Sequence, residues 1–125
     1  MIIGIGTDLV EIDRFRSALR RHGERLLRKV FTEEERCYCE SRMNRLAHYT
    51  ARFAGKEAVL KALGTGWSGG IAWTDVNIAH RQGGGTEVRL SGVAARVAER
   101  RKVRSVHLSL SHTDRYASAF ALAEG

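Results

Sequence analysis

Two acidic residues, Asp8 and Glu57, are the side chains in this sequence best suited to metal chemistry. Asp8 ends a short apolar strand, residues 2–8, whose two glycines would let another segment approach its backbone closely. Glu57 lies in a predicted helix, with Lys61 one turn later. Carboxylates from two distant segments suit a Mg²⁺ ion that also holds a substrate phosphate. From spacing alone, the alternative is a turn residue and an ordinary Glu57–Lys61 pair worth about 0.3–0.5 kcal/mol.

Helices in the first half of the chain must position these acids. Apolar residues at helical spacing predict a helix over 11–22 that ends near Gly23. The run Thr32–Glu35 resembles a capping box that opens a helix to about Glu40. A longer helix is expected over 44–63, with Gly64 as its stop.

The second half of the chain predicts two pairs of strands around a helix. Strands are expected at 74–80 and 86–91, a helix at 92–101, and strands at 104–111 and 116–123. In the strand at 104–111, apolar and polar residues alternate, which predicts one apolar face and one polar face. This order indicates an α+β fold with mostly antiparallel pairing, packed with a long helix.

Composition limits the possible partners. The 125 residues are the size of one domain, with no apolar run near 18 residues and no leader pattern, so we expect a soluble cytoplasmic protein. The net charge of +7 implies a negatively charged partner: a nucleic acid, an anionic nucleotide or an acidic protein. Cys37 and Cys39 are two residues apart on a predicted helix and are expected to be reduced.

Arginines gather on one side of the first predicted helix. On a continuous helical wheel, four arginines would lie opposite the apolar residues, within a sector of about 60°. These four are Arg14, Arg21, Arg25 and Arg28. Gly23 is expected to interrupt the helix and displace the later two. The pattern fits either a solvated face of a basic protein or a dock for an acidic helix.

A glycine-rich segment, Gly64–Gly70, follows the long predicted helix. Its backbone N–H groups could cradle a phosphate, but it lacks the lysine and the spacing of a P-loop. A helix stop followed by a flexible loop is the simpler interpretation.

Three sequence motifs resemble one enzyme family. The stretch Gly4–Phe15 (GIGTDLVEIDRF) resembles the N-terminal signature of holo-(acyl-carrier-protein) synthases, the small trimeric branch of the 4′-phosphopantetheinyl transferases. Arg52–Gly66 (RFAGKEAVLKALGTG) is similar to the second signature of that family, and Leu108–His112 (LSLSH) to the third. The motifs occur in family order and span the chain, so residues 1–125 are expected to form one synthase domain.

The resemblance implies a fold, an assembly and a reaction. The fold would be that of the 4′-phosphopantetheinyl transferases, and three copies would build each active site between neighbouring subunits. The enzyme would transfer the 4′-phosphopantetheine group of coenzyme A to a serine of apo acyl carrier protein, with Mg²⁺ as cofactor, and release adenosine 3′,5′-bisphosphate. Because the carrier supplies the nucleophile, no Ser-His or Cys-His arrangement is needed in this chain.

The resemblance also implies residue roles. Asp8 and Glu57 would be the Mg²⁺ ligands, Lys61 would lie beside the pyrophosphate, and Arg52 would contact a nucleotide phosphate. His107 would lie near the 3′-phosphate from the next subunit, while the roles of His112 and Asp114 stay open. The glycine-rich segment would border the coenzyme. The residues expected to hold the acidic carrier helix are Arg14, Arg21 and, less securely, Arg25.

The identity of the base that takes the serine proton is also open. It would be either Glu57, through a water on the metal, or Asp8 itself.

Two other functions are weighed against this one. A basic module for RNA or DNA would use the arginines to follow phosphates, but no RNA- or DNA-binding signature is present, aromatic residues are not interleaved with basic ones, and the two acids would be unexplained. No nucleic acid and no membrane are therefore expected as partners. A Mg²⁺-dependent phosphohydrolase could use the same acids, but it would turn over nucleotides without a protein acceptor.

Overall fold

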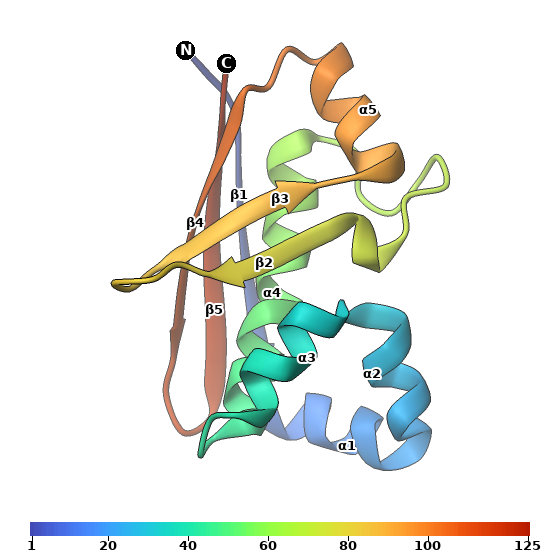
Figure 1. Cartoon of the computed structure of the whole chain (residues 1–125), viewed down its shortest axis with the longest axis vertical. Coiled ribbons are helices and arrows are strands. Elements are labelled where there is room, and N and C mark those ends of the chain that lie inside the picture. The colour runs from blue at the N-terminus through green and yellow to red at the C-terminus, as the bar shows by residue number, and fades with distance from the viewer.

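The computed structural model describes all residues 1–125 as an α+β fold with two antiparallel sheets (Figure 1). A three-stranded sheet has the order β1-β5-β4, and β2 pairs with β3 in a two-stranded sheet. The elements in chain order are β1 (Ile2–Glu11), α1 (Ile12–His22), α2 (Glu24–Val30), α3 (Glu33–Glu40), α4 (Arg45–Leu63), a 3₁₀ turn η1 (Trp73–Asp75), β2 (Val76–His80), β3 (Thr86–Leu90), α5 (Gly92–Arg100), β4 (Ser105–His112) and β5 (Tyr116–Glu124). No helix is long and apolar enough to span a membrane.

Helix α4 is the centre of the molecule, with the three-stranded sheet on one side and the small sheet on another (Figure 1). Its buried surface is rich in alanine, and the inward face of β5 consists of alanines as well. The glycines of β1 allow the closest approach: a Cβ on Gly4 would lie 2.0 Å from the carbonyl oxygen of Ala62, and one on Gly6 would lie 2.1 Å from that of Ala58. The segment that approaches the β1 backbone is therefore α4.

A second, aromatic core lies where α1, α2 and α3 pack against the N-terminal half of α4. It contains Phe15 from α1, Phe31 from the α2–α3 connection and Tyr49 from α4, all buried. The Phe31 and Tyr49 rings have centroids 4.9 Å apart. This core fixes α1 relative to α4, and so places the residues that α1 contributes to the surface beside β1.

The capping box predicted at Thr32–Glu35 is confirmed. The Glu35 amide donates to the Thr32 hydroxyl over 3.1 Å, and the Thr32 amide donates to Glu35 Oε1 over 2.8 Å. Glu35 also forms an ion pair of 2.8 Å with Lys56, and both side chains are completely buried. The cap therefore doubles as one half of a buried ion pair that ties α3 to α4.

The element boundaries differ from expectation in three places. Strand β1 continues past residue 8 to Glu11, because Leu9, Val10 and Glu11 pair with the first residues of β5. Residues after Gly23, which has a φ of 60°, form the separate short helix α2. Trp73–Asp75 forms a 3₁₀ turn where the start of a strand was expected, and Asp75 Oδ2 accepts a hydrogen bond from the Ala72 amide over 3.2 Å.

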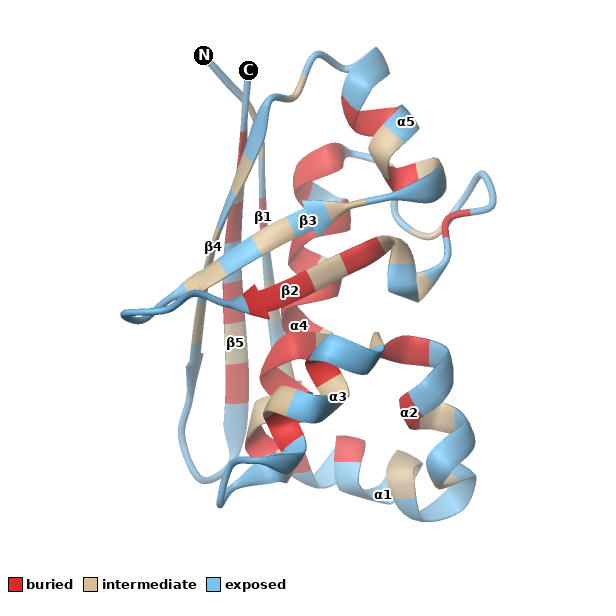
Figure 2. Ribbon diagram, viewed as in Figure 1, coloured by how far each residue is buried: buried red, intermediate tan, exposed pale blue.

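We call the sheet face that is turned away from α4 the outer sheet face. It carries four exposed apolar side chains: Ile5, Leu9, Tyr116 and Phe120. Figure 2 shows exposed residues along β1 and β5 beside the buried ones. Phe120 is opposite Thr7 in the register of β1 with β5, and about half of its surface is exposed. Contiguous exposed apolar side chains of this size are typical of an interaction surface.

Candidate active site

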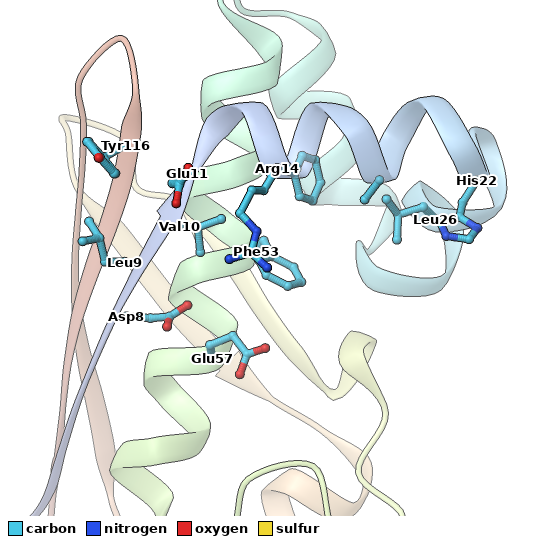
Figure 3. A pocket seen from close by; sticks show the side chains of 12 residues that line it. Asp8, Leu9, Val10, Glu11, Arg14, His22, Leu26, Phe53, Glu57 and Tyr116 are labelled. Atoms are coloured by element: carbon cyan, nitrogen blue, oxygen red, sulfur yellow. The ribbon is translucent and has the colours of Figure 1, made fainter.

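A pocket of about 630 Å³ lies between β1, α1 and α4 (Figure 3). Asp8 enters it from β1 and Glu57 from α4, and Figure 3 shows the two carboxylates close to each other on neighbouring elements. Arg14 of α1 and Phe53 of α4 line the same pocket. The two acids that are 49 positions apart in the sequence are thus brought to one site, as expected.

Local structure explains how each acid reaches the pocket. Asp8 is paired with Ala119 of β5, whose side chain is buried, so the Asp8 side chain is on the face of the sheet that packs against α4. Glu57 follows Phe53 by one helical turn and so points the same way. The close contact of β1 with α4, made possible by the glycines of β1, keeps the two backbones near enough for the carboxylates to share a pocket.

Lys61 binds the β1 side of the site. Its Nζ donates to the carbonyl oxygen of Thr7 over 2.9 Å and contacts Asp8 Oδ1 at 3.4 Å. The Lys61 side chain is about half exposed, so it can meet an anion from solvent while it contacts Asp8. Lys61 therefore lies at the edge of the site, beside Asp8.

The electrostatics of the pair favour a bound cation. Burial raises the pKa of Glu57, and the negative charge of Asp8 raises it further, while a hydrogen bond from Trp67 and the charge of Lys61 act in the opposite direction. A divalent cation between the two carboxylates would remove this repulsion.

The donor set fits Mg²⁺ in particular. No three acidic, histidine or cysteine side chains are placed so that together they could hold a metal ion, so a metal here would have two protein ligands at most from this chain. Mg²⁺ commonly binds through one or two carboxylates, keeps several waters and takes the phosphates of a substrate.

Two of the arginines expected to dock a partner lie on α1 and one on α2. Arg14 lines the pocket, while Arg21 and Arg25 lie on either side of Gly23 and are exposed. None of these three forms an ion pair, in contrast to Arg16 and Arg28, which pair with Asp13 and with Glu24. The break at Gly23 means that the continuous wheel holds only for Arg14 and Arg21.

Arg52 and His107 are not brought to this pocket within one chain. Arg52 is buried, donates from Nε to the carbonyl oxygen of Ile78 over 3.2 Å, and stacks on the ring of Tyr38 at 4.3 Å. Glu57 lies five positions after Arg52 on the helix, so the two side chains are rotated about 140° from each other around its axis. His107 is on the outward side of β4, bonded to Glu124 at 2.9 Å, so the sheet separates it from Asp8.

Arg52 belongs to a cationic and aromatic cluster that sequence reasoning missed. The cluster joins residues of α3, α4, β2, β4 and the loop before α4 around one tyrosine ring: Tyr38, Arg42, His48, Arg52, His80 and His112. His112 is the nearest neighbour of the His48 ring in this cluster, at 5.5 Å between centroids. Only the alternation of β4 hinted at it, because His112 ends that strand. Asp114 is exposed in the turn between β4 and β5.

The segment between α4 and η1, residues 64–72, borders the site through one side chain. Gly64 ends α4 in the left-handed conformation, as expected of a helix stop. Trp67 donates its indole N–H to Glu57 Oε2 over 3.3 Å. Sequence reasoning treated this segment as glycine-rich backbone and missed the tryptophan, whose partner lies ten positions earlier in the chain.

Comparison with known proteins agrees with this geometry. The pattern of the 4′-phosphopantetheinyl transferase superfamily matches residues 4–121. The chain is 55% identical over 125 residues to holo-[acyl-carrier-protein] synthase from Desulforudis audaxviator, covering 100% of this chain and 95% of that protein.

Solved structures give the same result. The synthase from Neisseria meningitidis has a TM-score of 0.92 at 30% identity, with full coverage of both chains. The synthase from Bacillus anthracis in complex with CoA (3′,5′-ADP) has a TM-score of 0.82 at 28% identity, covering 100% of this chain and 98% of that one. This chain therefore belongs to the 4′-phosphopantetheinyl transferase superfamily, in its holo-(acyl-carrier-protein) synthase family.

Proposed function

We propose that this protein, as one synthase domain over residues 1–125, transfers the 4′-phosphopantetheine group of coenzyme A to a serine of apo acyl carrier protein. The observation that carries the proposal is the full-length family match combined with the meeting of Asp8 and Glu57 at one pocket, with Lys61 in contact with Asp8 at its edge. The reaction releases adenosine 3′,5′-bisphosphate. It is the carrier modification that fatty acid synthesis requires.

Asp8 and Glu57 would hold Mg²⁺, which when bound supplies positive charge to the pyrophosphate of coenzyme A. In the reaction, the carrier serine oxygen forms a bond to the β-phosphorus, and the bond from that phosphorus to the bisphosphate oxygen breaks. One of the two carboxylates accepts the serine proton. Lys61 lies at the edge of the site, where its ammonium group can neutralise the departing bisphosphate.

The unpaired arginines of α1 and α2 are the proposed dock for the carrier. Arg14, Arg21 and Arg25 have no acidic partner of their own, so an acidic helix can pair with them without displacing one. Arg14 also lines the pocket, which places the docked carrier beside the reacting atoms. The net charge of +7 would further accelerate the encounter with an acidic protein.

We also propose that three copies assemble and that each active site uses two of them. The outer sheet face offers the apolar contact surface. His107 lies on that same side of the sheet. A neighbouring subunit that packs there would therefore receive His107 in its active site, although His107 does not reach the pocket of its own chain. The cationic cluster around Arg52 would contact a nucleotide phosphate that reaches across the subunit boundary.

Intact-mass analysis of apo acyl carrier protein tests the reaction. With coenzyme A and Mg²⁺, the carrier should gain one phosphopantetheine, and the gain should stop when the metal is chelated. Asp8→Asn and Glu57→Gln should each abolish the gain, whereas Glu99→Gln, which changes an exposed acid on α5, should leave it intact. Bisphosphate release without a carrier would instead indicate a phosphohydrolase.

Reversal of one arginine tests the carrier dock. Arg14→Glu should raise the KM for carrier protein while the KM for coenzyme A stays near its native value. Arg100→Glu is a matched control, because it makes the same charge change on α5, at the opposite end of the molecule from α1 (Figure 1). Equal effects of the two variants would show that only overall charge matters.

Sedimentation analysis tests the assembly. The native protein should have three times the chain mass of 13.9 kDa. Phe120→Asp places a charge on the outer sheet face and should yield a monomer without transferase activity. Met43→Asp changes an apolar residue that is fully exposed and lies outside the sheet, and it should leave the trimer intact. A native protein that sediments as a monomer would refute the shared active site.

A further inference from the structure

The indole of Trp67 is the only protein group that donates a hydrogen bond to Glu57. The bond runs from Trp67 Nε1 to Glu57 Oε2 over 3.3 Å, and Oε1 has no hydrogen-bond partner. Trp67 is partly buried and lies in the segment 64–72. A single donor on one oxygen fixes the plane of a carboxylate and leaves its other oxygen available to a cation.

A row of aromatic rings holds Trp67 in place. Its ring lies 3.7 Å from that of Trp73 between centroids, and the Trp73 ring stacks on Phe53 at 5.2 Å with an interplanar angle of 23°. Phe53 lines the pocket. The carbonyl oxygen of Trp73 accepts a hydrogen bond from the buried Lys56 over 3.1 Å. The buried Lys56 therefore anchors the residue in the middle of the row, Trp73, and the row ends with Trp67 beside Glu57.

The rest of the glycine-rich part of the segment, residues 65–70, has little to hold it. A Cβ on Gly66, Gly69 or Gly70 would meet nothing within 4 Å, and all three have positive φ values. The side-chain bonds of Thr65 and Ser68 stay within the segment. Trp67 is consequently the side chain that connects this glycine-rich backbone to the active-site carboxylate.

Trp67 could instead serve only to cover the core, since it packs beside the main apolar cluster. Covering a core requires the ring but not the N–H group, and a carboxylate is not needed next to it. A partly buried indole usually finds a hydrogen-bond partner, but water could supply one here. The two interpretations therefore differ in the effect of removing the N–H group while the ring is kept.

We propose that Trp67 is a positioning residue of this active site. Through its N–H group it orients Glu57 so that the free carboxylate oxygen can bind a divalent cation, and it ties the segment 64–72 to the edge of the pocket. This inference rests on the proposed function of Glu57 as a metal ligand. Hydrogen-bond partners behind a metal ligand typically change metal affinity by about 10- to 100-fold when they are removed.

The test compares Trp67→Phe with Trp73→Phe. The first keeps an aromatic ring and removes the bond to Glu57, while the second replaces an indole whose N–H group has no protein partner. Binding of Mn²⁺ in the presence of saturating coenzyme A can be followed by the paramagnetic resonance of the free ion. Trp67→Phe should weaken Mn²⁺ binding about tenfold, and Trp73→Phe should leave it at the native value.

Urea unfolding supplies the structural readout. If Trp67→Phe lowers Mn²⁺ affinity without lowering the free energy of unfolding, the positioning role is supported. If Trp67→Phe binds Mn²⁺ like the native protein, or if both variants lose affinity equally, the inference is wrong and the proposed function stands. If the native protein binds neither Mn²⁺ nor coenzyme A and modifies no carrier, the proposed function fails as well.

Discussion

Removal of the buried Lys56 ammonium group should be the most damaging single change outside the active site. Lys56 and Glu35 are both fully buried, 2.8 Å apart. The Lys56 ammonium group also donates to the carbonyl oxygens of Trp73 and Val76. Burial lowers the pKa of Lys56, and the Glu35 carboxylate opposes that shift, so the charged pair is maintained against a desolvation cost.

Methionine has a volume similar to that of lysine, so the Lys56→Met substitution would keep the packing but leave the Glu35 carboxylate buried without a cation. That carboxylate would keep only its backbone donors, the amides of Thr32 and Ile78, and the carbonyl oxygens of Trp73 and Val76 would each lose the Lys56 donor. Loss of one member of a buried pair typically costs about 3–5 kcal/mol. Because domains are commonly stable by only about 5–15 kcal/mol, the variant should be strongly destabilised.

Urea unfolding followed by far-ultraviolet circular dichroism measures this cost. The protein concentration must be fixed, since the stability of an assembly depends on it. The double variant Glu35→Gln/Lys56→Met removes both charges and should recover about 1–3 kcal/mol relative to Lys56→Met. Arg89→Met is the control, because it breaks exposed pairs with Glu34 and Glu87, each of which should contribute less than about 1 kcal/mol. The reasoning is refuted if Lys56→Met costs no more than Arg89→Met.

Three further outcomes are expected. Gly6→Ala should destabilise the fold by about 1–3 kcal/mol in urea unfolding, because its Cβ would overlap the Ala58 carbonyl oxygen; a neutral effect would contradict the close contact of β1 with α4. Burial, followed by the charges of the surrounding cluster, lowers the pKa of His48 below 6.5, so the unfolded chain takes up this proton more readily. Stability should therefore fall as the pH drops below 6.5, and His48→Gln should flatten that slope in unfolding measurements across the range. Burial raises the pKa of the Cys39 thiol to about 12, so mass analysis after iodoacetamide treatment of the folded protein should find label on the exposed Cys37 alone; modified Cys39 would mean that α3 opens readily.

Local signals in the sequence were enough for most element boundaries. The capping box at Thr32, the stop at Gly64 and the alternation in β4 each depend on a few neighbouring residues, and the structure confirms all three. Their physical basis is short-range: a cap satisfies the free amides of one turn, and alternation follows from the pleat of one strand. Residue type and the family motifs likewise indicated Asp8 and Glu57, and both line one pocket in the structure.

Burial on α4 was decided by tertiary structure. Both Arg52 and Lys56 are buried, although charged side chains on a helix are usually exposed and the sequence assigned no partner in this chain to either. Helix α4 is covered by β1, β4 and β5 on one side and by α3 and β2 on another, so its helical wheel has almost no solvated face. The partners of its charged residues come from α3 and β2, and no local pattern encodes which distant segment will supply a carboxylate or a carbonyl oxygen.

The meeting of functional groups depends on the same long-range packing. The glycines of β1 indicate that a backbone comes close, but only the fold shows that α4 is that backbone and that Glu57 thereby faces Asp8. The bond from Trp67 to Glu57 arises because the segment after α4 folds back onto the helix it leaves. A sequence fixes which residues can do chemistry, whereas the distances between them follow from contacts between segments far apart in the chain.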